Sequence, residues 1–179
     1  TFAPTDTLCR KQLVREQVLG SSQQLPTRRY RTLVGHAGLA SLEGQWATSD
    51  AVYHREVRNG GPPWGDSPIW QEQSPASYAA NFATPMLLTI GEKDYRVPYT
   101  QSLHFFTDLQ LMEVPSRLVV LPEAGHWPSW YEMAFYYLVH LDWFHQWLGG
   151  EPPGWDPERF LRNQVFGGAN LGAPDDDSD

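Results

Sequence analysis

The 179-residue sequence predicts an α/β fold, in which a mostly parallel sheet is flanked by helices. Residues 86–90 are an apolar run that Gly91 ends, and the run has the length of a buried strand. Residues 116–121 are a second β-prone run. Between the two, residues 99–112 carry apolar side chains at near-helical spacing. A strand, a helix and another strand in this order are typical of a parallel sheet.

The chain before this unit is expected to contain shorter elements. A β-prone run ends at Gly35, so His36 is expected in the following loop, where a histidine without an evident partner is more often structural than functional. Residues 60–68 are a turn-rich excursion. The expected elements are a strand over residues 30–34, a helix over residues 42–51 or beyond, and a short capped helix over residues 74–81.

The last long helix is expected over residues 133–148, which are apolar on more than one helical face. Gly149 and Gly150 follow it and end it. Beyond them, one modest helix is expected near residues 157–165. Before the first strand, residues 8–19 have the pattern of a short helix.

The composition excludes several classes of function. A formal net charge of −8 argues against nucleic acid binding, which needs a basic face. The single cysteine, Cys9, leaves no internal disulfide and no cysteine-based metal cluster. No apolar run reaches the ~20 residues that span a membrane. The first residues do not read as a signal peptide, which favours the cytoplasm without fixing the compartment.

Two polar residues follow the two predicted strands of the central unit. Asp94 comes after the first strand and His126 after the second. A histidine can take the proton of a serine hydroxyl and return it to a leaving group, and a buried carboxylate can fix the tautomer of that histidine. Asp94 and His126 are therefore candidate catalytic residues, in the Ser, Asp, His chain order of α/β-hydrolases. The structural alternative makes Asp94 the N-cap of the next helix and His126 a packed loop histidine.

The nucleophile of such a triad is not evident in this sequence. A nucleophile elbow has the pattern Gly-x-Ser-x-Gly, since the glycines free a sharp turn from Cβ clashes. The segment with Ser21 and Ser22 follows Gly20 but lacks the second glycine. Neither serine is therefore favoured as a nucleophile.

The loops of Asp94 and His126 resemble a known family. Gly91-Glu-Lys-Asp94-Tyr-Arg-Val-Pro98, with Gln101 beyond it, resembles the aspartate loop of the prolyl oligopeptidase family of serine peptidases, in the branch of acylaminoacyl peptidases and dipeptidyl-peptidase-V-like enzymes. Gly125-His126-Trp127 resembles the family's histidine loop. Supporting similarities are Pro115-Ser-Arg-Leu118, His36-Ala-Gly38, Gly61-Pro-Pro-Trp64, Ser74-Pro75 and Asn81-Phe82.

The resemblance covers about residues 27–149 and implies the C-terminal portion of an α/β-hydrolase fold. Asp94 and His126 match the aspartate and histidine of the family's triad. The family implies hydrolysis of peptide bonds in a peptide substrate, with no metal and no organic cofactor. On this basis residues 27–150 are expected to form a partial peptidase domain. Residues 1–26 are then a divergent N-terminal segment and residues 151–179 a tail whose acidic end is expected to be disordered.

Two features depart from the family pattern. No repeated short-strand signature predicts the β-propeller that members usually carry ahead of the hydrolase domain. The family's elbow lies roughly twenty residues before the strand matched here by residues 30–34, which would place the serine near Val14. Residues 10–17 contain neither serine nor glycine.

Three hypotheses follow. The chain is a catalytic-domain fragment that is active only with a serine and an oxyanion hole from another segment, or it is a non-catalytic remnant that serves as an interaction module. A zinc site at His140 and His145 is disfavoured, because a spacing of five puts them on different helix faces. An unprotected edge at residues 30–34 further predicts self-association or a complementary chain. Aromatics between Trp46 and Trp64 are the candidate wall of a specificity pocket.

Overall fold

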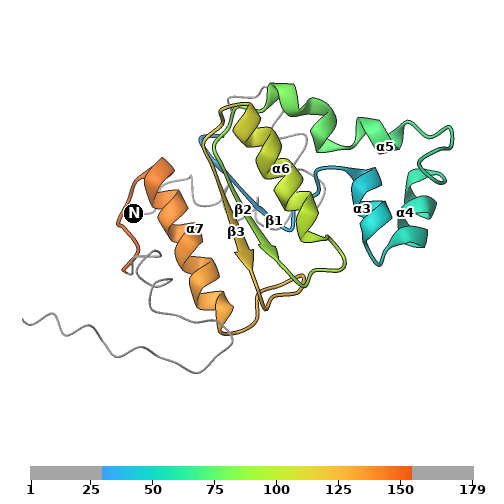
Figure 1. Ribbon diagram of the computed structural model, residues 1–179. Helices are drawn as coiled ribbons and strands as arrows, with labels where there is room; N and C mark the ends of the chain where they lie inside the picture. The colour runs from blue at the N-terminus through green and yellow to red at the C-terminus, as the bar shows by residue number, and fades with distance from the viewer. Residues whose placement is uncertain (1–29, 155–179) are drawn as a thin grey trace, which may run out of the picture.

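Three parallel strands form the sheet of this protein, which is described by a computed structural model over residues 30–154. The strands are β1 (Leu33–His36), β2 (Met86–Gly91) and β3 (Ser116–Leu121), in the order β1-β2-β3 (Figure 1). Leu33 pairs with Met86, which in turn pairs with Ser116. All three strands therefore end at the same edge of the sheet.

The central strand β2 is buried along its whole length, as expected for a strand covered on both faces. Its side chains alternate between two hydrophobic clusters. Met86 and Leu88 point to one cluster, and Leu87 points to the other. Each cluster is completed by a helix that lies on that face of the sheet.

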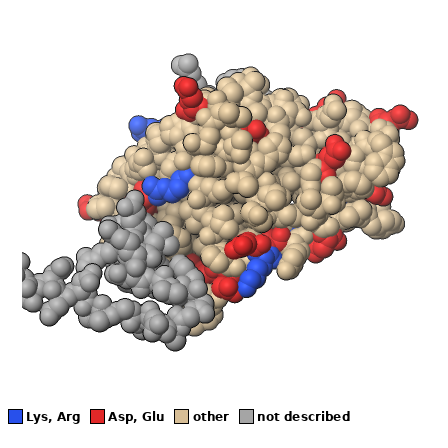
Figure 2. All heavy atoms as spheres, in the orientation of Figure 1, with Lys and Arg blue, Asp and Glu red and all other residues tan. Residues whose placement is uncertain are grey.

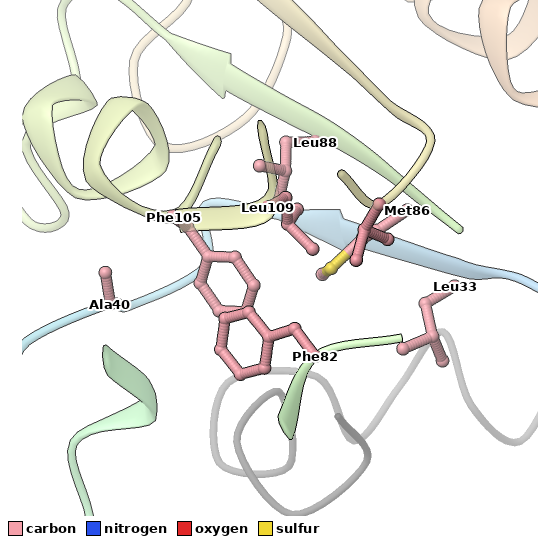
Figure 3. Close-up of a cluster of buried hydrophobic side chains, with 8 residues drawn as sticks. Leu33, Ala40, Phe82, Met86, Leu88, Phe105 and Leu109 are labelled. Atoms are coloured by element: carbon pink, nitrogen blue, oxygen red, sulfur yellow. The ribbon is translucent and has the colours of Figure 1, made fainter. Parts of the chain in front are cut away.

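On the first face lies α6 (Tyr99–Leu111). Phe105 of this helix stacks on Phe82, with ring centroids 5.1 Å apart and an interplanar angle of 9°. Figure 3 shows these two rings beside the side chains of β1 and β2. The buried residues of this cluster are Leu33, Ala40, Phe82, Met86, Leu88, Phe105, Leu109 and Val114.

On the opposite face lies α7 (Glu132–Leu148). Trp143 of this helix is buried, and its Nε1 donates a hydrogen bond to Thr32 Oγ1 at 2.6 Å. Gly149 ends the helix with a φ of 75°, a conformation that favours glycine. The buried residues of this cluster are Val34, Leu87, Leu121, Ala124, Phe135, Tyr136, Val139 and Trp143. The two helices and the sheet form an α/β arrangement, and the predicted fold class is confirmed.

Between β1 and β2 the chain forms a helical excursion that extends beyond one side of the sheet in Figure 1. Its elements are α3 (Leu42–Thr48), α4 (Val52–Asn59), α5 (Ile69–Glu72) and the 3-10 helix η1 (Pro75–Asn81). The Oγ of Ser41 caps α3 by accepting from Gly44 N–H at 3.0 Å.

Two expectations about this half of the chain are wrong. The predicted single helix over residues 42–51 breaks after Thr48, because Ser49 turns its hydroxyl back to the backbone N–H of Ala51 at 3.1 Å. The first strand begins at Leu33 and continues through Gly35 to His36. Gly35 lies within the strand, because it pairs with Leu88 of β2. A Cβ at this position would meet the flexible end of the Met86 side chain.

Other expectations fall outside the described residues. They are the helix over residues 8–19, the serine position near Val14, the candidates Ser21 and Ser22, the helix over residues 157–165 and the acidic end of the tail. Across residues 30–154, no helix combines the length and the apolar character needed to cross a membrane.

Candidate functional site

Asp94 lies in the loop between β2 and α6, here called the aspartate loop (residues 92–98), and its side chain is fully buried. Its Oδ1 accepts hydrogen bonds from the backbone N–H groups of Arg96 at 2.9 Å and Val97 at 2.8 Å. These bonds fix the carboxylate within its own loop. The alternative that Asp94 is the N-cap of α6 is wrong. The N-cap position is occupied by Pro98, and no side chain caps the helix there.

His126 lies in the loop between β3 and α7, here called the histidine loop (residues 122–131). Its side chain contacts Asp94 at the edge of the sheet. Its Nδ1 is 2.8 Å from Asp94 Oδ2, and its side chain is 26% exposed. A carboxylate oxygen accepts, so Nδ1 donates in this pair. In the neutral ring Nε2, on the side away from Asp94, is then the basic nitrogen. The two candidate catalytic residues are thus in direct contact, although 32 positions separate them in the chain.

The close approach of the two loops depends on Gly91. A Cβ at this position would overlap the carbonyl oxygens of Gly125 and Ala124 in the histidine loop. Two backbone hydrogen bonds join the loops there, from Glu92 N–H to Leu121 O and from Lys93 N–H to Ala124 O, both at 2.9 Å.

Gly125, the residue directly before the histidine, is not required to be glycine by the packing of its loop. A Cβ at Gly125 would meet only Lys93 O, at 3.9 Å, which is ordinary van der Waals contact. The position that requires glycine is Gly91, on the neighbouring loop.

A second histidine, His36, supports the histidine loop from the end of β1. Its Nε2 lies 2.8 Å from the carbonyl oxygen of His126, and its Nδ1 lies 3.1 Å from Thr89 Oγ1. Because a carbonyl oxygen only accepts, Nε2 carries the proton in this bond, and Nδ1 of the neutral ring accepts from the Thr89 hydroxyl. Burial lowers the pKa of His36 and so favours this neutral form.

The sequence alone suggested no partner for His36. Its ring also stacks on Trp127, with centroids 4.8 Å apart. The support that His36 gives to the histidine loop could have been predicted from its position at the carboxyl end of a strand next to β2. That end of a parallel sheet is where loops of several strands meet.

The helical excursion contacts the aspartate loop at two points. Gln45 of α3 donates from Nε2 to the carbonyl oxygen of Arg96 at 2.6 Å. Asp50, between α3 and α4, forms an ion pair with Arg96 in which Nε and Oδ1 are 2.7 Å apart. The exposed ring of Trp64 packs edge-on against Trp46, with centroids 5.5 Å apart. The predicted role of these tryptophans as a pocket wall stays a prediction.

Charged side chains near the site are mostly exposed. Lys93 pairs with Glu123 and links the aspartate loop to the histidine loop. Exposed pairs of this kind contribute little to stability, because water screens both charges. On the face drawn in Figure 2, acidic side chains are scattered among uncharged ones and the basic side chains form no cluster.

Within residues 30–154, no group of three histidine, cysteine, aspartate or glutamate side chains could hold a metal ion. His140 is buried in α7, its Nδ1 donates to Tyr136 O at 2.6 Å, and burial lowers its pKa to about 4.

A parallel sheet with an aspartate loop after one strand and a histidine loop after the next defines the class: this is the C-terminal part of an α/β-hydrolase fold. A family model described as "Prolyl oligopeptidase family" matches residues 19–151. The chain belongs to the prolyl oligopeptidase family.

Named relatives agree with this family. The chain is 30% identical over 126 residues to dipeptidyl-peptidase 5 of Porphyromonas gingivalis, a match that covers 68% of this chain and 18% of that protein. It is 31% identical over 100 residues to dipeptidyl-peptidase 5 of Schizosaccharomyces pombe, covering 56% and 15% of the two chains. The chain therefore spans less than a fifth of the length of these relatives.

Solved structures show the same fold. An acylaminoacyl peptidase of Pyrococcus horikoshii superimposes with a TM-score of 0.66 at 19% identity, covering 88% of this chain and 28% of that one. A puromycin hydrolase superimposes with a TM-score of 0.67 at 19% identity, covering 76% and 21%. These structures share the sheet and the flanking helices with the described part of this chain.

Proposed function

We propose that this chain supplies the aspartate and the histidine of a Ser-Asp-His triad in a serine peptidase. The observation that carries the proposal is the 2.8 Å contact between His126 Nδ1 and a buried, doubly hydrogen-bonded Asp94. A carboxylate fixed in this way orients the imidazole and stabilises the imidazolium that forms during the reaction.

In the proposed reaction, a serine hydroxyl attacks the carbonyl carbon of a peptide bond. His126 Nε2 takes the hydroxyl proton and then gives it to the leaving amine, which departs as the peptide bond breaks. A water molecule then attacks the acyl-enzyme. His126 Nε2 takes a proton from this water and gives it to the serine oxygen as the ester bond breaks, which releases the acid product and restores the serine. Asp94 keeps its negative charge throughout.

The serine and the oxyanion hole would come from a segment that carries a Gly-x-Ser-x-Gly turn, a pattern that the printed sequence does not contain. The substrate class is a peptide, as for the family. The names of the relatives favour removal of dipeptides or of acylated amino acids from the end of a peptide. Residues 27–150 would form the corresponding portion of the catalytic domain.

The test uses a fluorophosphonate, which labels only a serine activated by its triad. The full chain is incubated with the probe alone, and then after co-expression with the serine-bearing part of the Porphyromonas gingivalis relative's hydrolase domain. We expect no mass increase for the chain alone. In the co-purified complex, one labelled serine is expected on the partner segment.

The histidine is tested by substitution in that complex. His126→Ala should slow labelling by about 10²-fold or more, the usual contribution of a general base. His54→Ala, at an exposed position on α4, is the matched control and should label at the original rate. Labelling that His126→Ala leaves unchanged, or a folded complex that is never labelled, would contradict the proposal.

A second candidate function is an interaction module without catalysis, and the missing elbow motif favours it. In that case the co-purified complex would form and remain unlabelled, and Asp94→Asn would not change its affinity.

A further inference from the structure

Glu132 is the first residue of α7 and is completely buried. Glutamate is rarely buried to this extent unless its oxygens are satisfied by donors. Its carboxylate belongs to the same end of the molecule as the histidine loop, because α7 follows that loop directly.

The partners of Glu132 lie on the histidine loop, on both sides of His126. Oε1 accepts from the backbone N–H of Glu123 at 3.0 Å. Oε2 accepts from the hydroxyl of Ser129 at 2.6 Å and from its backbone N–H at 3.3 Å. One side chain therefore joins the beginning of the loop to its end, and His126 lies midway between the two attachment points.

The middle of the same loop is fixed from the opposite direction. His36 donates to the carbonyl oxygen of His126, and Lys93 N–H donates to Ala124 O. With both ends of the loop held by Glu132, the backbone of His126 cannot shift without breaking at least one of these bonds. A shift of that backbone would carry Nδ1 away from Asp94.

We infer that Glu132 is a positioning residue, which holds the loop so that His126 Nδ1 stays on Asp94. The importance of Glu132 for catalysis rests on the proposed function. The contact between His126 Nδ1 and Asp94 can be measured without any catalytic activity. An ordinary helix-capping role is the alternative. Capping accounts for the bonds to Ser129, which lies three residues before Glu132, but it does not account for the bond from the Glu123 N–H on the far side of His126.

The experiment is NMR on the full chain labelled with 15N. The proton on His126 Nδ1 should give a downfield resonance in the wild type, since it lies between nitrogen and a carboxylate. Glu132→Ala removes all three bonds, Glu132→Gln keeps the size of the side chain but replaces one accepting oxygen by a donor, and Ser129→Ala removes one donor. Asp142→Asn is the control, because Asp142 lies on the same helix and pairs with Arg117 on β3, away from the histidine loop.

We expect the Nδ1 resonance to be lost in Glu132→Ala and weakened in Glu132→Gln and Ser129→Ala, while Asp142→Asn retains it. Amide exchange at Glu123 and Ser129 should become about tenfold faster in Glu132→Gln, because a net hydrogen bond is lost. Thermal melts of all variants monitor the fold.

If Glu132→Ala does not fold, Glu132→Gln and Ser129→Ala decide the question. An unchanged Nδ1 resonance and unchanged exchange in both variants would overturn the positioning role. Absence of the resonance in the wild type would instead contradict the pair of Asp94 and His126, and with it the proposed function.

Discussion

Two buried histidines, His36 and His140, lie next to the candidate site. His36 and His140 both contact the ring of Tyr136, with centroids 5.2 Å and 4.1 Å away. Burial lowers the pKa of both histidines, and that of His140 falls to about 4. The interior next to the candidate site is thus built to hold neutral imidazoles, which keeps His36 in the neutral form, whose Nδ1 accepts from Thr89 while Nε2 donates to the histidine loop.

This burial makes stability depend on pH in the acid range. In the unfolded chain a histidine titrates near 6.5, whereas His140 in the folded chain takes up its proton only near 4. Between these values the unfolded state binds more protons, so stability falls as the pH drops from about 6.5 to about 4. The shift of His140 corresponds to a loss of about 3 kcal/mol at most.

His140→Phe tests this directly, because phenylalanine keeps an aromatic ring beside Tyr136 and does not titrate. Urea unfolding at pH 7 and at pH 4.5 should show a smaller loss of stability in the variant than in the wild type. His54→Phe, on the exposed surface of α4, should retain the wild-type difference between the two pH values. A variant at residue 140 with the full wild-type loss would show that other groups cause the acid sensitivity.

At the scale of elements, the site is formed by two loops whose positions the sheet dictates. β2 and β3 are parallel and in register from Met86 and Ser116 to Gly91 and Leu121, so the loops that follow them start side by side. The aspartate loop can then lie against the histidine loop only if the last residue of β2 has no side chain. The requirement for glycine at residue 91 is a property of this packing of one loop on another.

Gly91→Ala should therefore disturb both loops. Its Cβ overlaps backbone atoms that cannot rotate away, and overpacking of this kind usually costs about 1–3 kcal/mol. We expect a lower urea midpoint and loss of the His126 Nδ1 resonance. Gly125→Ala is the matched control on the facing loop, where the added Cβ makes only an ordinary van der Waals contact with Lys93 O and should change stability by no more than about 0.5 kcal/mol. Equal stability of the two variants would contradict this account.

At the scale of the whole molecule, α7 has a second apolar face. Its inner face packs on the sheet, while Tyr137, Leu141 and Leu148 are 58%, 55% and 47% exposed. Spacings of four and seven place these three side chains on one side of the helix. Among the described strands, β1 also has a neighbour on one side only, which is β2. An apolar helix face and a sheet edge both favour association.

We therefore expect the purified chain to associate, either with itself or with a complementary chain. Light scattering should give a mass above the 20.4 kDa of the single chain. Leu141→Glu should reduce the associated fraction, because it places a charge in the middle of the exposed face of α7. Leu111→Glu, at a more exposed position at the end of α6 (77% against 55% for Leu141), should leave association unchanged. A wild-type chain that stays at 20.4 kDa over a wide concentration range would contradict the prediction.

The elements with a strong local pattern could be predicted from the amino-acid sequence. The strand over residues 116–121 was predicted at its observed bounds, and the helices on both faces of the sheet were predicted to within one residue at each end. It also pointed to Asp94 and His126, because each follows its own strand and sits in a loop with a family-like pattern. The period of hydrophobic residues and the residue types that favour turns depend on a few neighbouring positions, so they can be recognised in the sequence.

The contacts between those elements could not be predicted, because they depend on how distant segments pack together. The need for glycine at residue 91 comes from carbonyl groups more than thirty positions away, and the partner of His36 is the carbonyl oxygen of His126, 90 positions away. Glu132 lies just before the helix predicted over residues 133–148, and its bonds to Glu123 and Ser129 exist only in the folded loop. These contacts depend on strand register and on the path of the loops between elements, which no local pattern in the chain specifies.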